Sequence, residues 1–188
     1  MLKVSLDCES SFTLSQEISI TVKVTYESPR KGYARPIVFH TYPFLDNQTK
    51  REGYRLYCQR DDKWEKFEKD GATGFILVDD PDVQVNVATD KHFQCLSPGE
   101  SWSHMERLKT QDTANFPGLD DAKAGDKFRF LFKGTHIDWW DWGSAEEHSN
   151  TVVKLPCWLF GPVVDPKDNG GRPKLIVSCS EPVEFVLV

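Results

Sequence analysis

The stretch Ile18-Ser19-Ile20-Thr21-Val22-Lys23-Val24-Thr25-Tyr26 decides the fold class. Apolar side chains occupy every second position, and polar or charged side chains fill the positions between them. Side chains of a β-strand alternate between the two faces of a sheet, so this pattern predicts a strand with one buried face. Most of the residues are β-branched and therefore favour an extended backbone. We predict a half-buried strand over residues 18–26.

A second stretch repeats this pattern nearer the C-terminus. Over residues 126–132, three phenylalanines (Phe128, Phe130, Phe132) alternate with Lys127, Arg129 and Leu131, which predicts an inward face of three aromatic rings. Residues 64–69 fit either an irregular strand or a short helical turn. Shorter strands are expected at residues 2–6, 37–42, 54–58, 74–78, 83–87, 92–96, 101–108, 152–155, 158–164, 175–177 and 183–188. Many short strands separated by turn residues, without an amphipathic helix, predict an all-β sandwich or barrel.

Two further segments favour the sandwich. The turn Leu96-Ser97-Pro98-Gly99-Glu100-Ser101 and the segment Ala124-Gly125-Asp126-Lys127-Phe128 resemble the corner before strand F of immunoglobulin-like domains. In that family a glycine-acid turn leads into a strand whose first aromatic side chain packs under the corner. The family usually has Tyr where this chain has Phe128, so the hydrogen bond of that corner cannot form here. The resemblance implies an immunoglobulin-like antiparallel β-sandwich, and it implies a fold without a function. The length of 188 residues predicts that this sandwich is a single domain over residues 1–188 with long loops.

The charge balance narrows the class of partner. The chain has 188 residues, with 23 Lys and Arg against 29 Asp and Glu, which gives a net charge of −6. An acidic protein without a basic run is not attracted to phosphate backbones, so we expect no nucleic-acid partner.

The cysteines and the apolar runs indicate a compartment. Five cysteines are an odd number, and they are widely spaced at positions 8, 58, 95, 157 and 179, which is typical of free thiols. The first residues lack the apolar core of a signal peptide, and no apolar run reaches the length of about 18 residues that crosses a membrane. We expect a cytoplasmic protein without a membrane partner; a mature secreted chain is the alternative.

The candidate site is the stretch from residue 134 to residue 148, which contains three tryptophans, two histidines and four carboxylates. If the strand that ends at Phe132 continued unbroken, His136 and Asp138 would lie on its inward face, where unpaired polar groups are costly. Either Gly134 forms a bulge that reverses the alternation, or the strand reaches the end of the sandwich. In the second case His136 and Asp138 line the mouth of a pocket. Its walls would be Trp139, Trp140 and Trp142.

Three kinds of chemistry fit this stretch. The spacing His136-x-Asp138 is similar to the start of a non-haem iron triad, but His148 follows too early for the last ligand, so we expect no metal and no cofactor. Acid–base catalysis could use Asp138 and Asp141, or the two glutamates beside His148, so the candidate catalytic residues are His136, Asp138, Asp141 and His148. Alternatively, Asp141 and the two glutamates are solvated loop charges, and Ser144 caps a short helical turn.

Binding without chemistry is the interpretation that we favour. The candidate ligand-binding residues are His136, Asp138, Trp139, Trp140 and Trp142, because indole rings beside carboxylates suit a sugar-like or small apolar ligand, or a protein partner. The sequence therefore predicts a binding or interaction module that uses a Trp- and carboxylate-rich loop at one end of a sandwich. The alternative is a small enzyme or ligand-shaping protein of specialised metabolism with acid–base or metal chemistry between His136 and His148. The sequence leaves the oligomeric state open.

Overall fold

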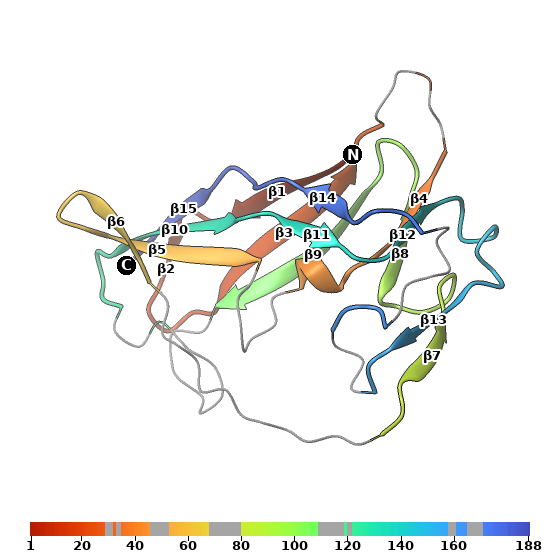
Figure 1. Ribbon diagram of the computed structural model, residues 1–188. Coiled ribbons are helices and arrows are strands. Elements are labelled where there is room, and N and C mark those ends of the chain that lie inside the picture. The colour runs from red at the N-terminus through yellow and green to blue at the C-terminus, as the bar shows by residue number, and fades with distance from the viewer. Residues whose placement is uncertain are drawn as a thin grey trace.

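A computed structural model describes residues 1–28, 32, 35–45, 53–67, 80–108, 119, 122–157, 161–164 and 171–188. Over these residues the chain forms fifteen strands and one short 3-10 helix, and no α-helix. A three-stranded sheet and a five-stranded sheet face each other, and three further sheets extend them toward one end (Figure 1). The all-β class and the antiparallel pairing predicted from the sequence are confirmed.

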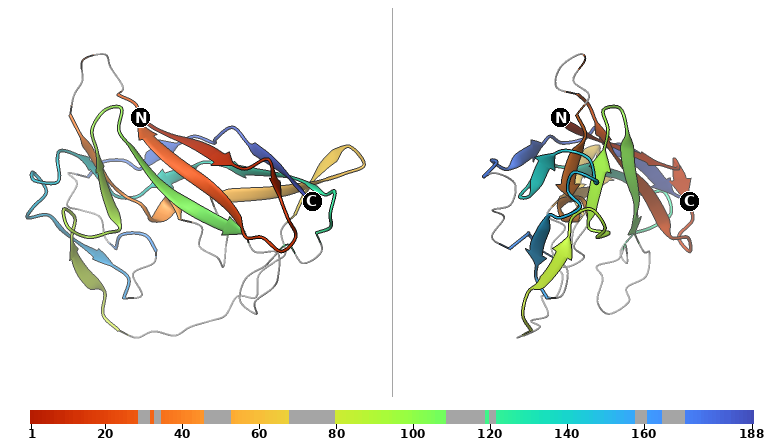
Figure 2. Two further views of the ribbon diagram at one scale, coloured as in Figure 1. Left: turned by 180° about the vertical axis from the view of Figure 1, so that it is seen from behind. Right: turned by 90° about the vertical axis from the view of Figure 1, so that its right-hand side faces the viewer.

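The first sheet is built around the stretch that opened the sequence. Its order is β1 (Leu2–Cys8), β3 (Ile18–Tyr26) and β9 (Ser101–Leu108), with both pairs antiparallel. The five apolar side chains of β3 at even positions each expose 0% of their surface. The predicted alternation therefore holds along the whole strand. Figure 2 (left) shows this sheet in front, as seen from behind.

The second sheet is built around the triple-phenylalanine strand. Its order is β2 (Ser11–Phe12), β15 (Val183–Leu187), β10 (Lys127–Phe132), β5 (Tyr54–Arg60) and β6 (Lys63–Lys66). Phe128, Phe130 and Phe132 each expose 0%, as the alternation predicted. The pair of β2 and β15 is parallel, and the other pairs of this sheet are antiparallel. Of the two alternatives for residues 64–69, the strand is found, and it ends at Lys66.

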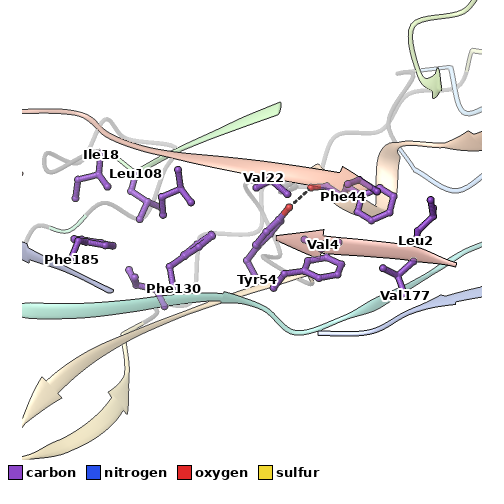
Figure 3. Packing of buried hydrophobic residues seen from close by; sticks show 14 of the residues in the cluster. Leu2, Val4, Ile18, Val22, Phe44, Tyr54, Leu108, Phe130, Val177 and Phe185 are labelled. Carbon is purple, nitrogen blue, oxygen red and sulfur yellow. Dashed lines mark hydrogen bonds between the residues drawn. The ribbon is translucent and has the colours of Figure 1, made fainter. Parts of the chain in front are cut away.

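The main core fills the space between these two sheets. Ile18 and Leu108 of the first sheet face Phe130 and Phe185 of the second (Figure 3). The 3-10 helix η1 (Tyr42–Phe44) packs at one end of this core through the buried ring of Phe44. The hydroxyl of Tyr54 donates a 2.6 Å hydrogen bond to the carbonyl oxygen of Phe44 and so ties this helix to β5. Burying aromatic side chains of this size is a large part of what stabilises such a fold.

Two of the three further sheets form a lobe at one end of the molecule, and the third packs against the main core. The first lobe sheet has the order β12 (Trp140–Trp142), β4 (Ile37–His40) and β8 (Phe93–Leu96). The second lobe sheet pairs β7 (Val83–Asn86) with β13 (Val152–Leu155). The remaining sheet pairs β11 (Thr135–Ile137) with β14 (Leu175–Val177). Strand β4 is buried on both faces: Ile37 and Phe39 belong to the main core, and Val38 belongs to a second core. The second core consists of Val38, Val85, Val87, Phe93, Trp139, Val153, Leu155 and Val163. The sheet of β12, β4 and β8 thus separates two cores.

Some expectations fall outside the described residues. The strand expected at 74–78, and residues 158–160 of the strand expected at 158–164, lie in parts of the chain that are not described. Within the described ranges, no helix has the length and hydropathy that are needed to cross a bilayer.

Candidate functional site

Gly134 marks the point where the alternation of β10 ends. Its φ of +91° is accessible to glycine but unfavourable for other residues, and a Cβ atom there would lie 2.9 Å from the carbonyl oxygen of Val177. Before Gly134 the buried positions are even, and after it Ile137 exposes 0% while His136 is exposed. The backbone therefore reverses its parity here, which was one of the two alternatives considered for this glycine.

His136 consequently lies on the outer surface. It stands opposite Ile176 in the β11–β14 pair, and its Nε2 atom lies 3.2 Å from the Nζ atom of Lys174. A lysine ammonium can only donate, so this ring nitrogen of His136 acts as the acceptor. His136 is thus part of the exposed surface of the β11–β14 pair and does not share an internal pocket with Asp138.

Asp138 turns inward and meets His40. Its Oδ2 atom accepts a 2.6 Å hydrogen bond from the backbone N–H of Val163, and its Oδ1 atom lies 3.6 Å from Nδ1 of His40. That separation exceeds hydrogen-bond length, so the contact with His40 is primarily electrostatic. Burial raises the pKa of the Asp138 carboxyl, but the contacts with His40 and Val163 outweigh burial and lower the pKa below its ordinary value of 3.8.

The imidazole of His40 is sealed inside the lobe. Its exposed fraction is 0%, and its ring stacks between those of Tyr42 and Phe93, at centroid distances of 5.9 and 5.0 Å. Among the described residues, neither ring nitrogen of His40 has a hydrogen-bond partner, nor do Oδ1 of Asp138 and Nε1 of Trp139. Buried polar atoms of this kind are costly, so the carboxylate and the imidazole depend on each other.

The three tryptophans divide between the two cores. Trp139 exposes 0% and packs edge-to-face on Phe93 in the second core, whereas Trp140 exposes 8% and belongs to the main core. Trp142 is half-buried and contacts Trp140 and Tyr26. Neighbouring side chains of a strand point to opposite faces, and both faces are covered here, so two adjacent indoles are both buried.

Asp141 secures the chain that leads into β14. It forms an ion pair with Arg172, whose guanidinium lies 5.5 Å from the ring of Trp140. The Nε1 atom of Trp140 donates a 2.9 Å hydrogen bond to the carbonyl oxygen of Pro173. Together Trp140 and Asp141 hold residues 172–173 against the lobe.

His148 is buried, and both of its ring nitrogens lie near polar atoms of the fold. It exposes 6%, its Nε2 lies 3.3 Å from the carbonyl oxygen of Trp142, and its Nδ1 lies 3.1 Å from the hydroxyl of Thr151. Just before it, the N–H of Glu147 donates to the hydroxyl of Ser144, and the N–H of Ser144 donates to the Glu147 carboxylate. This reciprocal pair is a capping arrangement for one turn of chain, as the structural alternative supposed.

The candidate catalytic residues therefore have separate surroundings. His136 faces solvent, Asp138 meets His40, Asp141 meets Arg172 and His148 meets backbone and Thr151. In the described part of the chain, no group of three or more His, Cys, Asp or Glu side chains has a geometry that could hold a metal ion.

Sequence reasoning missed two histidines. His40 ends a run of apolar residues, and its polarity inside that run was the available signal. His104 and Glu106 lie on the inward face of β9 beside Trp102, with Nε2 and Oε1 2.8 Å apart. Their spacing of two residues on an edge strand could have indicated this pair. Comparison of the chain with protein-family models, with curated proteins and with solved structures gave no match.

Proposed function

We propose that the protein is a single-domain immunoglobulin-like β-sandwich that acts as a binding module, with its recognition surface at the end that carries the lobe. The strand order supports this fold. Strands β1, β3 and β9 correspond to A, B and E of that fold, and β5, β10 and β15 correspond to C, F and G. The first aromatic of β10, Phe128, packs on Phe185 at 5.4 Å, just after the corner at Gly125 and Asp126.

The origin of the lobe supports the location of the recognition surface. Its strands come from three connections, between β3 and β5, between β6 and β9, and between β10 and β15. Strands from different connections pair with one another: β4, from the first connection, pairs with β8 from the second and with β12 from the third. In immunoglobulin-like sandwiches the B–C and F–G loops share one end, and loops on a rigid scaffold are where binding residues concentrate.

The observation that carries the proposal is the exposed surface of the antiparallel β11–β14 pair. Ile176 exposes 75% of its surface, and it lies beside His136 and near Lys174. An apolar side chain that is exposed to solvent on a strand and has polar neighbours resembles the centre and rim of a protein interface, so a protein partner could bury it. In this proposal the tryptophan loop contributes indirectly, because Trp140 and Asp141 fix the chain just before this surface.

The test compares two matched surface variants. Ile176→Asp should weaken binding of the partner by at least about tenfold, because a buried carboxylate would replace an apolar contact. Met105→Asp is the control, since Met105 exposes 52% on the outward side of β9 in the other sheet. Native mass spectrometry of protein purified from its own host would identify what co-purifies, and calorimetry would then measure the affinity of each variant. Equal affinities for both variants, or the absence of any bound molecule, would contradict the proposal.

A second candidate function is acid–base catalysis by His40 and Asp138. The buried imidazole with two unpartnered nitrogens beside a carboxylate of lowered pKa is the observation that favours it. A His40→Ala variant that keeps its fold but loses turnover of activated esters or glycosides would support this candidate. A variant that loses its fold and any turnover together would assign the pair to stability.

A cytoplasmic location belongs to the same proposal. All five cysteines are free, and burial, with Asp7 and Glu9 nearby, raises the pKa of the Cys8 thiol to about 11. Unpaired thiols suit a reducing compartment.

A further inference from the structure

The outward side of the five-stranded sheet carries a cluster of aromatic and cationic residues. In the registers of this sheet, Arg129 lies opposite Tyr57 on one side and Glu184 on the other, and Tyr57 lies opposite Lys66. These residues alternate with the inward phenylalanines of β10, so they share the side of the sheet that faces away from the core. We call this surface the β10 face.

Arg129 is held in place at the centre of the β10 face. Its guanidinium carbon lies 4.2 Å from the centroid of the Trp64 ring, and its Nε atom donates a 2.9 Å hydrogen bond to Glu184. A planar guanidinium fixed by a ring and a carboxylate loses little entropy when it binds a further carboxylate. Trp, Tyr and Arg are also the residue types that dominate binding energy at protein interfaces.

The charge of this face is opposite to that of the chain. The outward positions of its strands include four cations and one anion, a net charge of +3: Arg55, Lys66, Lys127, Arg129 and Glu184. The whole chain has a net charge of −6, so the remainder has −6 − 3 = −9. Such a separation of charge orients an approaching partner and favours an acidic one at this face.

We propose that the β10 face binds an acidic segment of another protein. Carboxylates of that segment meet Arg129, Lys66 and Lys127, and its apolar side chains cover Tyr57 and Leu131. A single-stranded nucleic acid fits less well, because bases need an open aromatic ring and Arg129 already covers one side of Trp64. This surface is separate from the Ile176 surface, so either proposal can fail without the other.

The test uses a fluorescein-labelled polyglutamate peptide as the probe. Fluorescence anisotropy should detect binding that weakens as salt is added, and Arg129→Glu should weaken it by about tenfold or more. Lys127→Glu, at an exposed position of the same face, should weaken it in the same direction without disturbing the contact of Arg129 with Trp64. Lys23→Glu is the control, because Lys23 is exposed on the outward side of β3 in the other sheet.

Three outcomes would overturn the inference. One is equal binding by the Lys127→Glu and Lys23→Glu variants, or no binding by the wild type. Another is tighter binding of labelled oligothymidylate than of polyglutamate, which would assign the face to nucleic acid. The third is self-association of the wild type in analytical ultracentrifugation that Arg129→Glu abolishes, which would make the occupant a second copy of the chain. Circular dichroism of each variant verifies that its fold is retained.

Discussion

The contact between Asp138 and His40 yields a sharp prediction about stability. Asp138→Asn keeps the shape of the side chain but removes its charge. Removing one member of a buried polar contact leaves the other without compensation, which costs about 1–3 kcal/mol and more where a charge is involved. The amide oxygen of Asn can still accept the N–H of Val163, which in the native protein donates to Oδ2 at 2.6 Å. We therefore expect Asp138→Asn to lower the free energy of unfolding by about 2–4 kcal/mol.

Urea unfolding followed by tryptophan fluorescence measures this change, because Trp139 lies in the same core as the lobe strands. A double-mutant cycle with His40→Phe separates the pair from its surroundings. If the two groups interact, the double variant should lose less than the sum of the single losses, by about 0.5–3 kcal/mol. Additive losses, or a loss below about 1 kcal/mol for Asp138→Asn, would refute this account of the pair.

The same pair predicts a pH dependence with a definite sign. The pKa of Asp138 is lower in the folded protein than its ordinary value of 3.8, so the folded state favours the ionised carboxylate. Its contribution to stability is present above that ordinary value and is lost as pH falls through the lower folded pKa. The stability difference between wild type and Asp138→Asn should therefore shrink as pH falls below about 4.

Three further predictions test the fold. Phe130→Ala should cost about 3–5 kcal/mol, because Phe130 exposes 0% and stacks on Tyr54 at 5.2 Å; a loss below about 1 kcal/mol in urea unfolding would mean that the inward face is wrong. Gly134→Ala should destabilise more than Gly125→Ala, because both glycines have positive φ but only at Gly134 would a Cβ atom meet backbone; equal losses would rule out this close approach. Exposed Cys179 should react with maleimide before buried Cys58, and mass spectrometry of partly labelled protein that finds the reverse order would contradict the described burial.

The strands could be predicted because their signal is local. In β3 and β10 one face is buried and the other faces solvent, so apolar and polar residues alternate with a period of two in the sequence. Gly134 could be recognised as a point of conflict for the same reason, since a polar residue fell where the period required an apolar one. The direction of the reversal needed the structure, because it depends on the close approach of Val177 from β14.

The lobe could not be predicted because its signal is not local. Strand β4 is buried on both faces, so it shows an apolar run without alternation, and a short run of this kind fits many structures. The partner of Asp138 lies far away in the sequence, in a strand whose pairing depends on three separate connections. The sequence identified Asp138 as an anomaly but gave no means of finding His40.

Packing and ion pairing alone can account for the density of large and ionisable side chains in residues 134–148, without reference to a function. Three indoles within four residues cannot share one core, but the sheet of β12, β4 and β8 has a core on each side, and Trp139 and Trp140 fill one each. Two carboxylates in the same stretch have structural contacts: Asp138 lies against the buried imidazole of His40, and Asp141 forms an ion pair with Arg172. A stretch that meets packing demands on two sides leaves few of its own side chains in solvent. Under the proposed function, recognition at this end would fall to residues that the stretch holds in position, such as Ile176, which exposes 75% of its surface.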